Sequence, residues 1–175
     1  MVEKKQINFP RYEHYKDSGI DWIGEIPAHW IGVPGFSFLR LNDIRNDRLI
    51  EKNVLSLSYG EIIHRPPEKL TGLVPESFET YQIIKPGDII IRGTDLQNDK
   101  LSLRVGYSNY RGIITSAYLG LKVRNSISSK YIYYFLHTLD TTKAIYGLGT
   151  GLRQNLSFDD FKKMRFILPP LPEQT

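Results

Sequence analysis

Three consecutive isoleucines, Ile89–Ile91, place the strongest constraint on how this chain folds. Residues 85–88, Lys-Pro-Gly-Asp, form a turn sequence, because proline presets one backbone dihedral and glycine permits a positive φ. A polar stretch begins at Gly93. A short, uninterrupted apolar run between two such segments is typical of a strand that is covered on both faces. The sequence therefore predicts an interior strand over residues 87–92.

Further strands are expected before and after this one, and helices only late in the chain. The order of strands first and helices last, without strand–helix alternation, predicts an α+β domain. We expect a mixed, mainly antiparallel β-sheet or partial barrel, with several short helices toward the C-terminus. The other strands are predicted over residues 38–45, 54–59, 101–105, 113–123 and 165–168. The three helices are predicted over residues 131–136 after an N-cap at Ser128 or Ser129, over residues 141–146 after Asp140, and from Ser157 with Asp160 as its capping-box partner.

Sequence patterns of catalysis or metal binding are absent. The chain has no cysteine, which excludes disulfides and thiolate metal sites. Its four histidines are far apart and match no metal-ligand spacing. A phosphate-binding loop and a nucleophile elbow are both missing, and the glycines of residues 147–151 follow a helix signal rather than a strand. We therefore expect a non-enzymatic chain, in which His29 makes a structural hydrogen bond.

The length of 175 residues fits one domain with a real core. The first residues are polar and are not followed by an apolar signal region. No apolar run approaches the ~18 residues that a membrane span needs. We expect a cytoplasmic protein.

Charge and side-chain type point to DNA as the partner. The net charge is +4, and the excess lies in residues 88–175, where Lys and Arg outnumber Asp and Glu by 12 to 7. Such an asymmetry suits a polyanion, or it is chance on a solvated surface. Residues 92–104 mix the long polar side chains that contact bases and phosphates. A solvated hairpin connection explains this loop equally well. Its candidate DNA contacts are Arg92, Thr94, Gln97, Asn98, Lys100 and Arg104.

A second loop, residues 149–156, has a composition that favours DNA contact more strongly. Its glycines allow the backbone to approach a phosphate, and it leads into a helix N-terminus, which favours anions. Arginine, glutamine and asparagine are the residue types that make bidentate contacts to bases. The candidate DNA contacts from this second loop are Thr150, Arg153, Gln154 and Asn155. Outside both loops, Arg111 is a further candidate, because aromatic residues surround it in the basic half of the chain.

The two ends of the chain carry the most distinctive sequences. Residues 15–30 read YKDSGIDWIGEIPAHW and contain both tryptophans, and residues 167–174 read ILPPLPEQ. Between them lie IKPGDIII at residues 84–91 and GTGLRQNLSF at residues 149–158. In this order and spacing, the four segments resemble the specificity subunits of Type I DNA restriction–modification systems, in the N-terminal target-recognition domain.

The resemblance implies a domain that reads one half of a split, asymmetric DNA site. In the family, two such domains are separated by conserved helices; modification subunits methylate adenine with S-adenosylmethionine, and restriction subunits add ATP-dependent translocation and cleavage. No cofactor is expected in this chain, since S-adenosylmethionine, ATP and Mg²⁺ belong to the partner subunits. The resemblance further implies one domain over residues 1–168 and the start of a truncated spacer helix over residues 169–175.

Two other functions stay open from the sequence. The chain is alternatively the recognition domain of a single-chain DNA methyltransferase or Type IIG-like enzyme, in which a catalytic domain precedes it. It is otherwise a protein-interaction module that uses its tyrosines and its proline-rich end.

Overall fold

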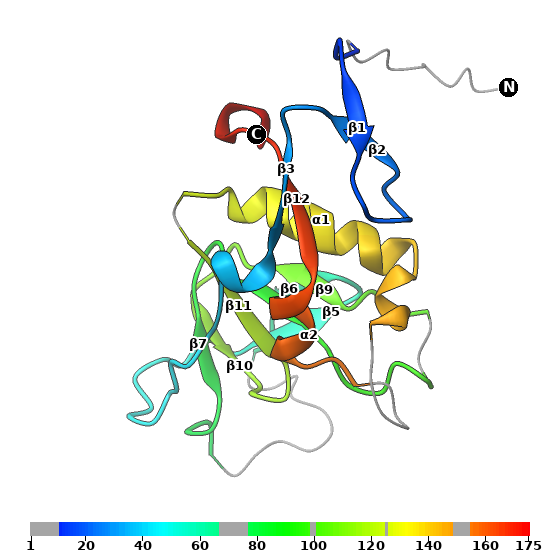
Figure 1. The fold of residues 1–175 in the computed structure, drawn as a ribbon. Helices are drawn as coiled ribbons and strands as arrows, with labels where there is room; N and C mark the ends of the chain where they lie inside the picture. The colour runs from blue at the N-terminus through cyan, green and yellow to red at the C-terminus, as the bar shows by residue number, and fades with distance from the viewer. Residues whose placement is uncertain (1–10, 67–76, 99–100, 125, 149–154) are drawn as a thin grey trace, which may run out of the picture.

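The computed structural model describes residues 11–66, 77–98, 101–124, 126–148 and 155–175 (Figure 1). Short strands come first along the described part of the chain and the α-helices come late, which confirms the predicted α+β class. The strands are β1 (Tyr15–Asp17), β2 (Glu25–Pro27), β3 (Ile31–Pro34), β4 (Leu39–Leu41), β5 (Leu55–Ser58), β6 (Glu61–His64), β7 (Gln82–Ile84), β8 (Ile89–Ile91), β9 (Val105–Tyr107), β10 (Gly112–Ile114), β11 (Leu119–Val123) and β12 (Arg165–Leu168). The helices are α1 (Ser129–Thr141) and α2 (Phe158–Lys163), with the 3-10 turns η1 (Gly35–Ser37), η3 (Ala144–Gly147) and η4 (Leu171–Glu173).

The largest sheet among the described residues has six strands in the order β4-β11-β8-β9-β6-β5. Most of its neighbours are antiparallel, and β6 and β9 form a parallel pair. Two-stranded antiparallel sheets join β1 to β2, β7 to β10 and β3 to β12. The described strands therefore form open, mixed and mainly antiparallel sheets, as the sequence predicted.

The isoleucine strand β8 is the interior strand that the sequence predicted. All three of its side chains have no solvent exposure. Ile89 and Ile91 belong to the larger hydrophobic core with Leu121 and Leu136, whereas Ile90 belongs to a second core. Alternate side chains of a strand point to opposite faces, so β8 is covered on both sides.

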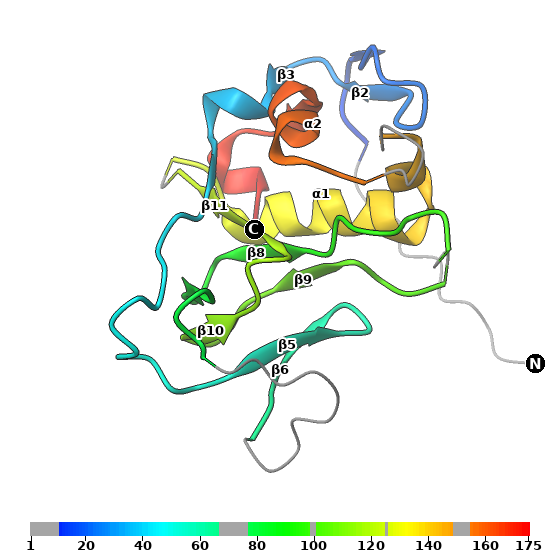
Figure 2. The same ribbon diagram turned by 90° about the horizontal axis from the view of Figure 1, so that it is seen from below.

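Different layers cover the two faces of the six-stranded sheet. On one face lies α1, whose Ile132, Leu136 and Leu139 are buried in the larger core; Figure 2 shows this helix running along the sheet above β8 and β9. On the other face, Ile84 of β7 and Ile114 of β10 pack in the second core. Two layers on a central sheet explain how a chain of short strands buries so many isoleucines.

The helix signals at Ser128 and Ser157 are confirmed. The Ser128 hydroxyl accepts a hydrogen bond from the backbone N–H of Tyr131 at 3.3 Å, so it caps α1. The backbone N–H of Ser157 donates to Asp160 Oδ2 at 2.7 Å in the predicted capping box. Asp140 does not cap a helix, because α1 continues through it to Thr141.

Three other predicted elements differ from the structure. The segment predicted as a helix over residues 141–146 contains instead the 3-10 turn η3, Ala144–Gly147. Of the strand predicted over residues 101–105, only Val105 lies in a strand. The stretch over residues 113–123 contains two strands, β10 and β11, that belong to different sheets. A turn that changes sheets is not visible in a continuous apolar run, because the pairing partners are distant in the sequence.

Candidate nucleic-acid interface

The tryptophan-containing segment is joined to the C-terminal Pro-Glu-Gln sequence through one carboxylate. Trp30 Nε1 and the Tyr12 hydroxyl donate to Glu173 Oε2 at 2.9 and 2.7 Å, and His29 Nε2 lies 2.8 Å from Oε1. Gln174 is buried, and its side-chain oxygen accepts a hydrogen bond from the backbone N–H of Ser128, the N-cap of α1, at 2.9 Å. The two distinctive ends of the sequence therefore meet in the structure, and the hydrogen bond expected of His29 is present.

Glu173→Gln is expected to lower the midpoint of thermal unfolding at neutral pH. Hydrogen bonds from Tyr12, Trp30 and His29 hold the pKa of the Glu173 carboxyl below its usual value of 4.5. A carboxyl group with a lowered folded-state pKa contributes stability above its unfolded-state pKa, and this contribution is lost as the pH falls through the folded-state pKa. The two midpoints should therefore converge in acid. Thermal unfolding of both proteins between neutral pH and about pH 3 measures this, and a difference that is the same at every pH would contradict a role for the charge.

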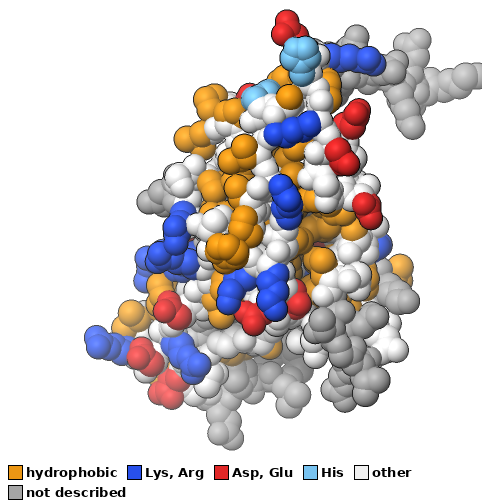
Figure 3. All heavy atoms as spheres, in the orientation of Figure 1, with side chains coloured by type: hydrophobic (Ala, Val, Ile, Leu, Met, Phe, Trp, Pro, Cys, Tyr) orange, Lys and Arg blue, Asp and Glu red, His pale blue; other side chains and the backbone are white. Residues whose placement is uncertain are grey.

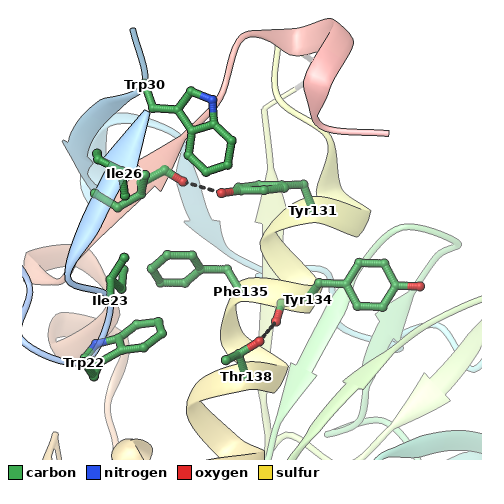
Figure 4. A pocket seen from close by; sticks show the side chains of 9 residues that line it. Trp22, Ile23, Ile26, Trp30, Tyr131, Tyr134, Phe135 and Thr138 are labelled. Atoms are coloured by element: carbon green, nitrogen blue, oxygen red, sulfur yellow. Dashed lines mark hydrogen bonds between the residues drawn. The ribbon is translucent and has the colours of Figure 1, made fainter. Parts of the chain in front are cut away.

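An apolar hollow of about 250 Å³ lies between the tryptophan segment and α1 (Figure 4). Two of the hydroxyl groups at its wall are already used: that of Tyr131 donates to the Ile167 carbonyl at 2.7 Å, and that of Thr138 donates to the Tyr134 carbonyl at 2.9 Å. Phosphates and base edges need donors and acceptors that are available to them. This hollow does not suit a nucleic acid. Its lining residues are Trp22, Ile23, Ile26, Trp30, Tyr131, Tyr134, Phe135, Thr138 and Ile167.

The first predicted DNA loop leaves the sheet at the end of β8 and presents its polar side chains to solvent. Thr94, Gln97 and Asn98 are exposed, and Arg92 is half-buried. Leu96 between them has no solvent exposure and anchors the loop in the larger core. The loop is therefore built on an apolar anchor with polar residues on both sides of it.

The second predicted loop meets the first one at Asn155. The Asn155 side-chain oxygen accepts from the backbone N–H of Asp95 at 2.9 Å. The backbone N–H of Leu156 donates to the Gly93 carbonyl at 2.7 Å. Residues 93–98 and 155–156 thus lie side by side, which the sequence alone did not indicate. Their exposed members are Thr94, Asp95, Gln97, Asn98 and Asn155. Lys100, Thr150, Arg153 and Gln154 lie outside the described residues, so their contacts stay predictions.

A tyrosine that the sequence analysis did not select lies beside these loops. Tyr59, in the turn between β5 and β6, is 84% exposed and has a φ of 48°. Tyr59 and Gly60 both have a positive φ, as a two-residue hairpin turn of this kind requires, and the turn leaves the Tyr59 side chain in solvent. Tyr59 lines a hollow of about 210 Å³ together with Ser58, Arg92 and Ser102. The only sequence signal for it was the turn at Gly60, which carried no indication of exposure.

Arg104 does not present its side chain to a ligand in this structure, contrary to its selection as a DNA contact. Its side chain has no solvent exposure and is the largest of the fully buried side chains among the described residues. The guanidinium donates to the Thr94 carbonyl at 2.7 Å and to the Asp95 carbonyl at 3.1 Å. An arginine selected by residue type is thus a part of the interior that supports the loop.

Arg111 is exposed, but the structure does not bring it together with the two loops. It follows β9, whereas the loop of residues 92–104 precedes this strand. Its Nε lies 2.9 Å from Glu51 Oε2. The backbone hydrogen bond from Asn53, followed by those from the Arg111 side chain and the Lys52 backbone, lowers the pKa of the Glu51 carboxyl, although burial opposes this. Arg111 therefore belongs to a different part of the surface.

A second positively charged surface lies on the edge of the six-stranded sheet. Arg40 of β4 and Lys122 of β11 are directly opposite each other in the antiparallel ladder. With Val123 and Arg124 they line a hollow of about 300 Å³, and Figure 3 shows Lys and Arg side chains gathered at this edge. Like charges in opposed positions destabilise a sheet, so this edge suits an anionic neighbour. This charged edge lies near Ile89, at the start of β8. The two polar loops lie near Ile91, at the opposite end of the same strand.

Two other features are absent from the part of the chain that the structure describes. No group of three or more His, Asp or Glu side chains there is arranged to hold a metal ion. Within the same residues, no helix has the length and apolar character that crossing a membrane requires.

Comparison with known proteins finds relatives in structure but none in sequence: no family model matches the chain, and no curated protein matches it. The HsdS subunit from Thermoanaerobacter tengcongensis has a TM-score of 0.52 and 19% identity, over 91% of this chain and 37% of that one. A chain from work on complex assembly and conformational transition of the type I R-M system has a TM-score of 0.57 and 16% identity, over 91% and 38%. This chain thus shares its fold with solved chains of type I systems, and spans well under half the length of either.

Proposed function

We propose that this chain is the target-recognition domain of a specificity subunit of a type I restriction–modification system. The observation that carries the proposal is the meeting of the two polar loops, at residues 93–98 and 155–156, on one exposed surface. The fold that the chain shares with the HsdS subunit supports it, as does the contact between the two distinctive ends of the sequence. Proteins with one fold often differ in function, so the surface rather than the fold is the main argument.

The domain reads one half of a bipartite DNA site and directs partner subunits to it. Gln97 has an exposed amide group of the kind that pairs bidentately with adenine in the major groove. The amides of Asn98 and Asn155 make hydrogen bonds to Asp95, so these two residues hold the loop beside Gln97. Thr94 and Tyr59 have hydroxyl groups, and Arg92 has the cation, that contact phosphates and fix the register on the duplex. The chain itself is not an enzyme. S-adenosylmethionine, ATP and Mg²⁺ are bound by the partner modification and restriction subunits.

The test is binding of the purified chain to a pool of random-sequence DNA duplexes at several salt concentrations. We expect one short sequence to be enriched over successive rounds of selection. Affinity should fall steeply with salt, with a slope of roughly −0.9 in log–log coordinates for each phosphate contact. Binding without any enriched sequence, or no binding at low salt, would remove the proposal. Co-purification with a modification subunit tests the proposed partner separately.

A further inference from the structure

Arg104 connects the interior of the protein to the backbone of the first polar loop. One terminal nitrogen of its guanidinium donates to the carbonyls of Arg92 and Thr94, at 3.2 and 2.7 Å, and the other donates to the carbonyl of Asp95 at 3.1 Å. The guanidinium also lies over the Tyr146 ring, 5.5 Å from its centroid. Three carbonyls within four residues of chain thus converge on one side chain.

A buried carboxylate fixes the position of Arg104 itself. Asp140 of α1 has no solvent exposure, and its Oδ2 accepts from the backbone N–H groups of Arg104 and Val105. Carboxylates that accept hydrogen bonds from backbone N–H groups form strong, charge-assisted contacts. The buried face of α1 is therefore linked through Asp140 and Arg104 to the carbonyls of the loop.

Burying a guanidinium is unfavourable unless its donors are satisfied, so this arrangement needs a reason to exist. A loop that is exposed on one side loses conformational freedom when it binds a ligand, and this loss weakens binding unless the loop is already ordered. Arg104 orders residues 92–95 from the inside, and Asn155 holds the same segment from the other side through Asp95. The exposed side chains are then left to contact a ligand.

We propose that Arg104 is a positioning residue that sets the sequence specificity of the DNA-reading loop without touching DNA. This rests on the proposed function of the loop. Discrimination between base pairs requires that a side chain such as Gln97 holds a fixed geometry, whereas attraction to phosphates does not. Loss of Arg104 should therefore remove discrimination between DNA sequences and leave general, salt-dependent binding to DNA.

The conservative variant Arg104→Lys tests the geometry. Lysine keeps the positive charge but presents one compact ammonium group, which does not reproduce the planar fork that reaches three carbonyls. Arg104→Met removes the charge as well. The matched control is Arg48→Met, which removes an exposed arginine that is not a candidate DNA contact and lies outside both loops.

The first measurement is hydrogen exchange at the backbone N–H groups of Asp95 and Leu156, both of which donate into the loop contacts. In Arg104→Lys we expect exchange at these two amides to be faster by about a hundredfold, because several hydrogen bonds to a charged group are lost. Amides of β8 should keep their exchange rates. The same measurement is informative whether or not the protein binds DNA.

The second measurement is the ratio of affinities for the selected DNA sequence and for unrelated DNA. We expect this ratio to fall toward one in both Arg104 variants, and to be unchanged in Arg48→Met. Unchanged exchange at Asp95 and Leu156 in Arg104→Lys would overturn the inference, independently of any DNA result. Faster exchange with an unchanged ratio would also overturn it. A wild-type chain that selects no sequence would instead refute the proposed function, while the exchange data still decide whether Arg104 orders the loop.

Discussion

Gly93→Ala is expected to separate the two polar loops and to destabilise the protein. A Cβ at this position would lie 2.5 Å from the Leu156 carbonyl oxygen and 3.2 Å from Leu156 Cβ. Both obstacles belong to the chain segment whose backbone N–H donates to the Gly93 carbonyl at 2.7 Å. Backbone cannot rotate away as a long side chain does, so the loops must move apart. Overpacking of this kind lowers the free energy of unfolding by about 1–3 kcal/mol.

The same change should reduce affinity for the selected DNA sequence by roughly 10- to 100-fold, because contacts from at least one loop are lost at about 1–3 kcal/mol for each base contact. Titration of fluorescently labelled duplex measures this loss, and chemical denaturation measures the loss of stability. Gly147→Ala is the matched control, since no atom lies within 4 Å of the added Cβ. Full affinity in Gly93→Ala would mean that the two loops do not act as one surface.

Local sequence signals predicted the parts of the fold that depend on neighbouring residues. The strand Arg165–Leu168, the N-cap Ser128 and the capping box at Ser157 are all present. Each is decided within a few residues by turn chemistry, capping hydrogen bonds or an apolar run. The burial of β8 was also predictable from local sequence, because three successive isoleucines leave the strand without a polar face.

These local signals did not predict which distant segments pair with each other. β12 pairs with β3 across more than half of the chain, and β11 pairs with β4 across nearly half of it. Asp140 illustrates the same limit, since aspartate is a common helix cap but here accepts from the backbone N–H groups of Arg104 and Val105, 36 and 35 residues away. Burial decided its role, and burial is a property of the folded chain.

In the candidate site, some residues were predicted correctly from the sequence and others were not. Residue type identified the exposed Thr94, Gln97, Asn98 and Asn155, because long polar side chains near glycine favour loops. The same criterion selected Arg104, which is buried, and it did not select Tyr59, which is among the most exposed of the large side chains described. Composition of a loop therefore indicates which residues are able to contact DNA, but not which of them point outward.

Ile90→Ala is expected to be the most destabilising single change considered for this protein. Ile90 has no solvent exposure and packs against Leu55, Ile84 and Ile114 in the second core. Its partners on the two adjacent strands are Gly120 and Gly106. Neither glycine has a side chain that moves into the space, so the cavity stays open and the cost lies high in the range for such changes. We expect a loss of about 4 kcal/mol in the free energy of unfolding.

Such a loss should lower the midpoint of thermal unfolding by about 10 °C for a chain of this size. Calorimetry measures it, and Ile50→Ala supplies the matched control, because Ile50 is 68% exposed and surface substitutions usually change stability by less than about 0.5 kcal/mol. Below its lowered midpoint, Ile90→Ala should still select the same DNA sequence, since Ile90 points into the core away from the loops. A change in the selected sequence without loss of stability would contradict the separation between the core of the sheet and the surface that reads DNA. A stability equal to that of Ile50→Ala would contradict the two-sided burial of β8 on which the whole architecture depends.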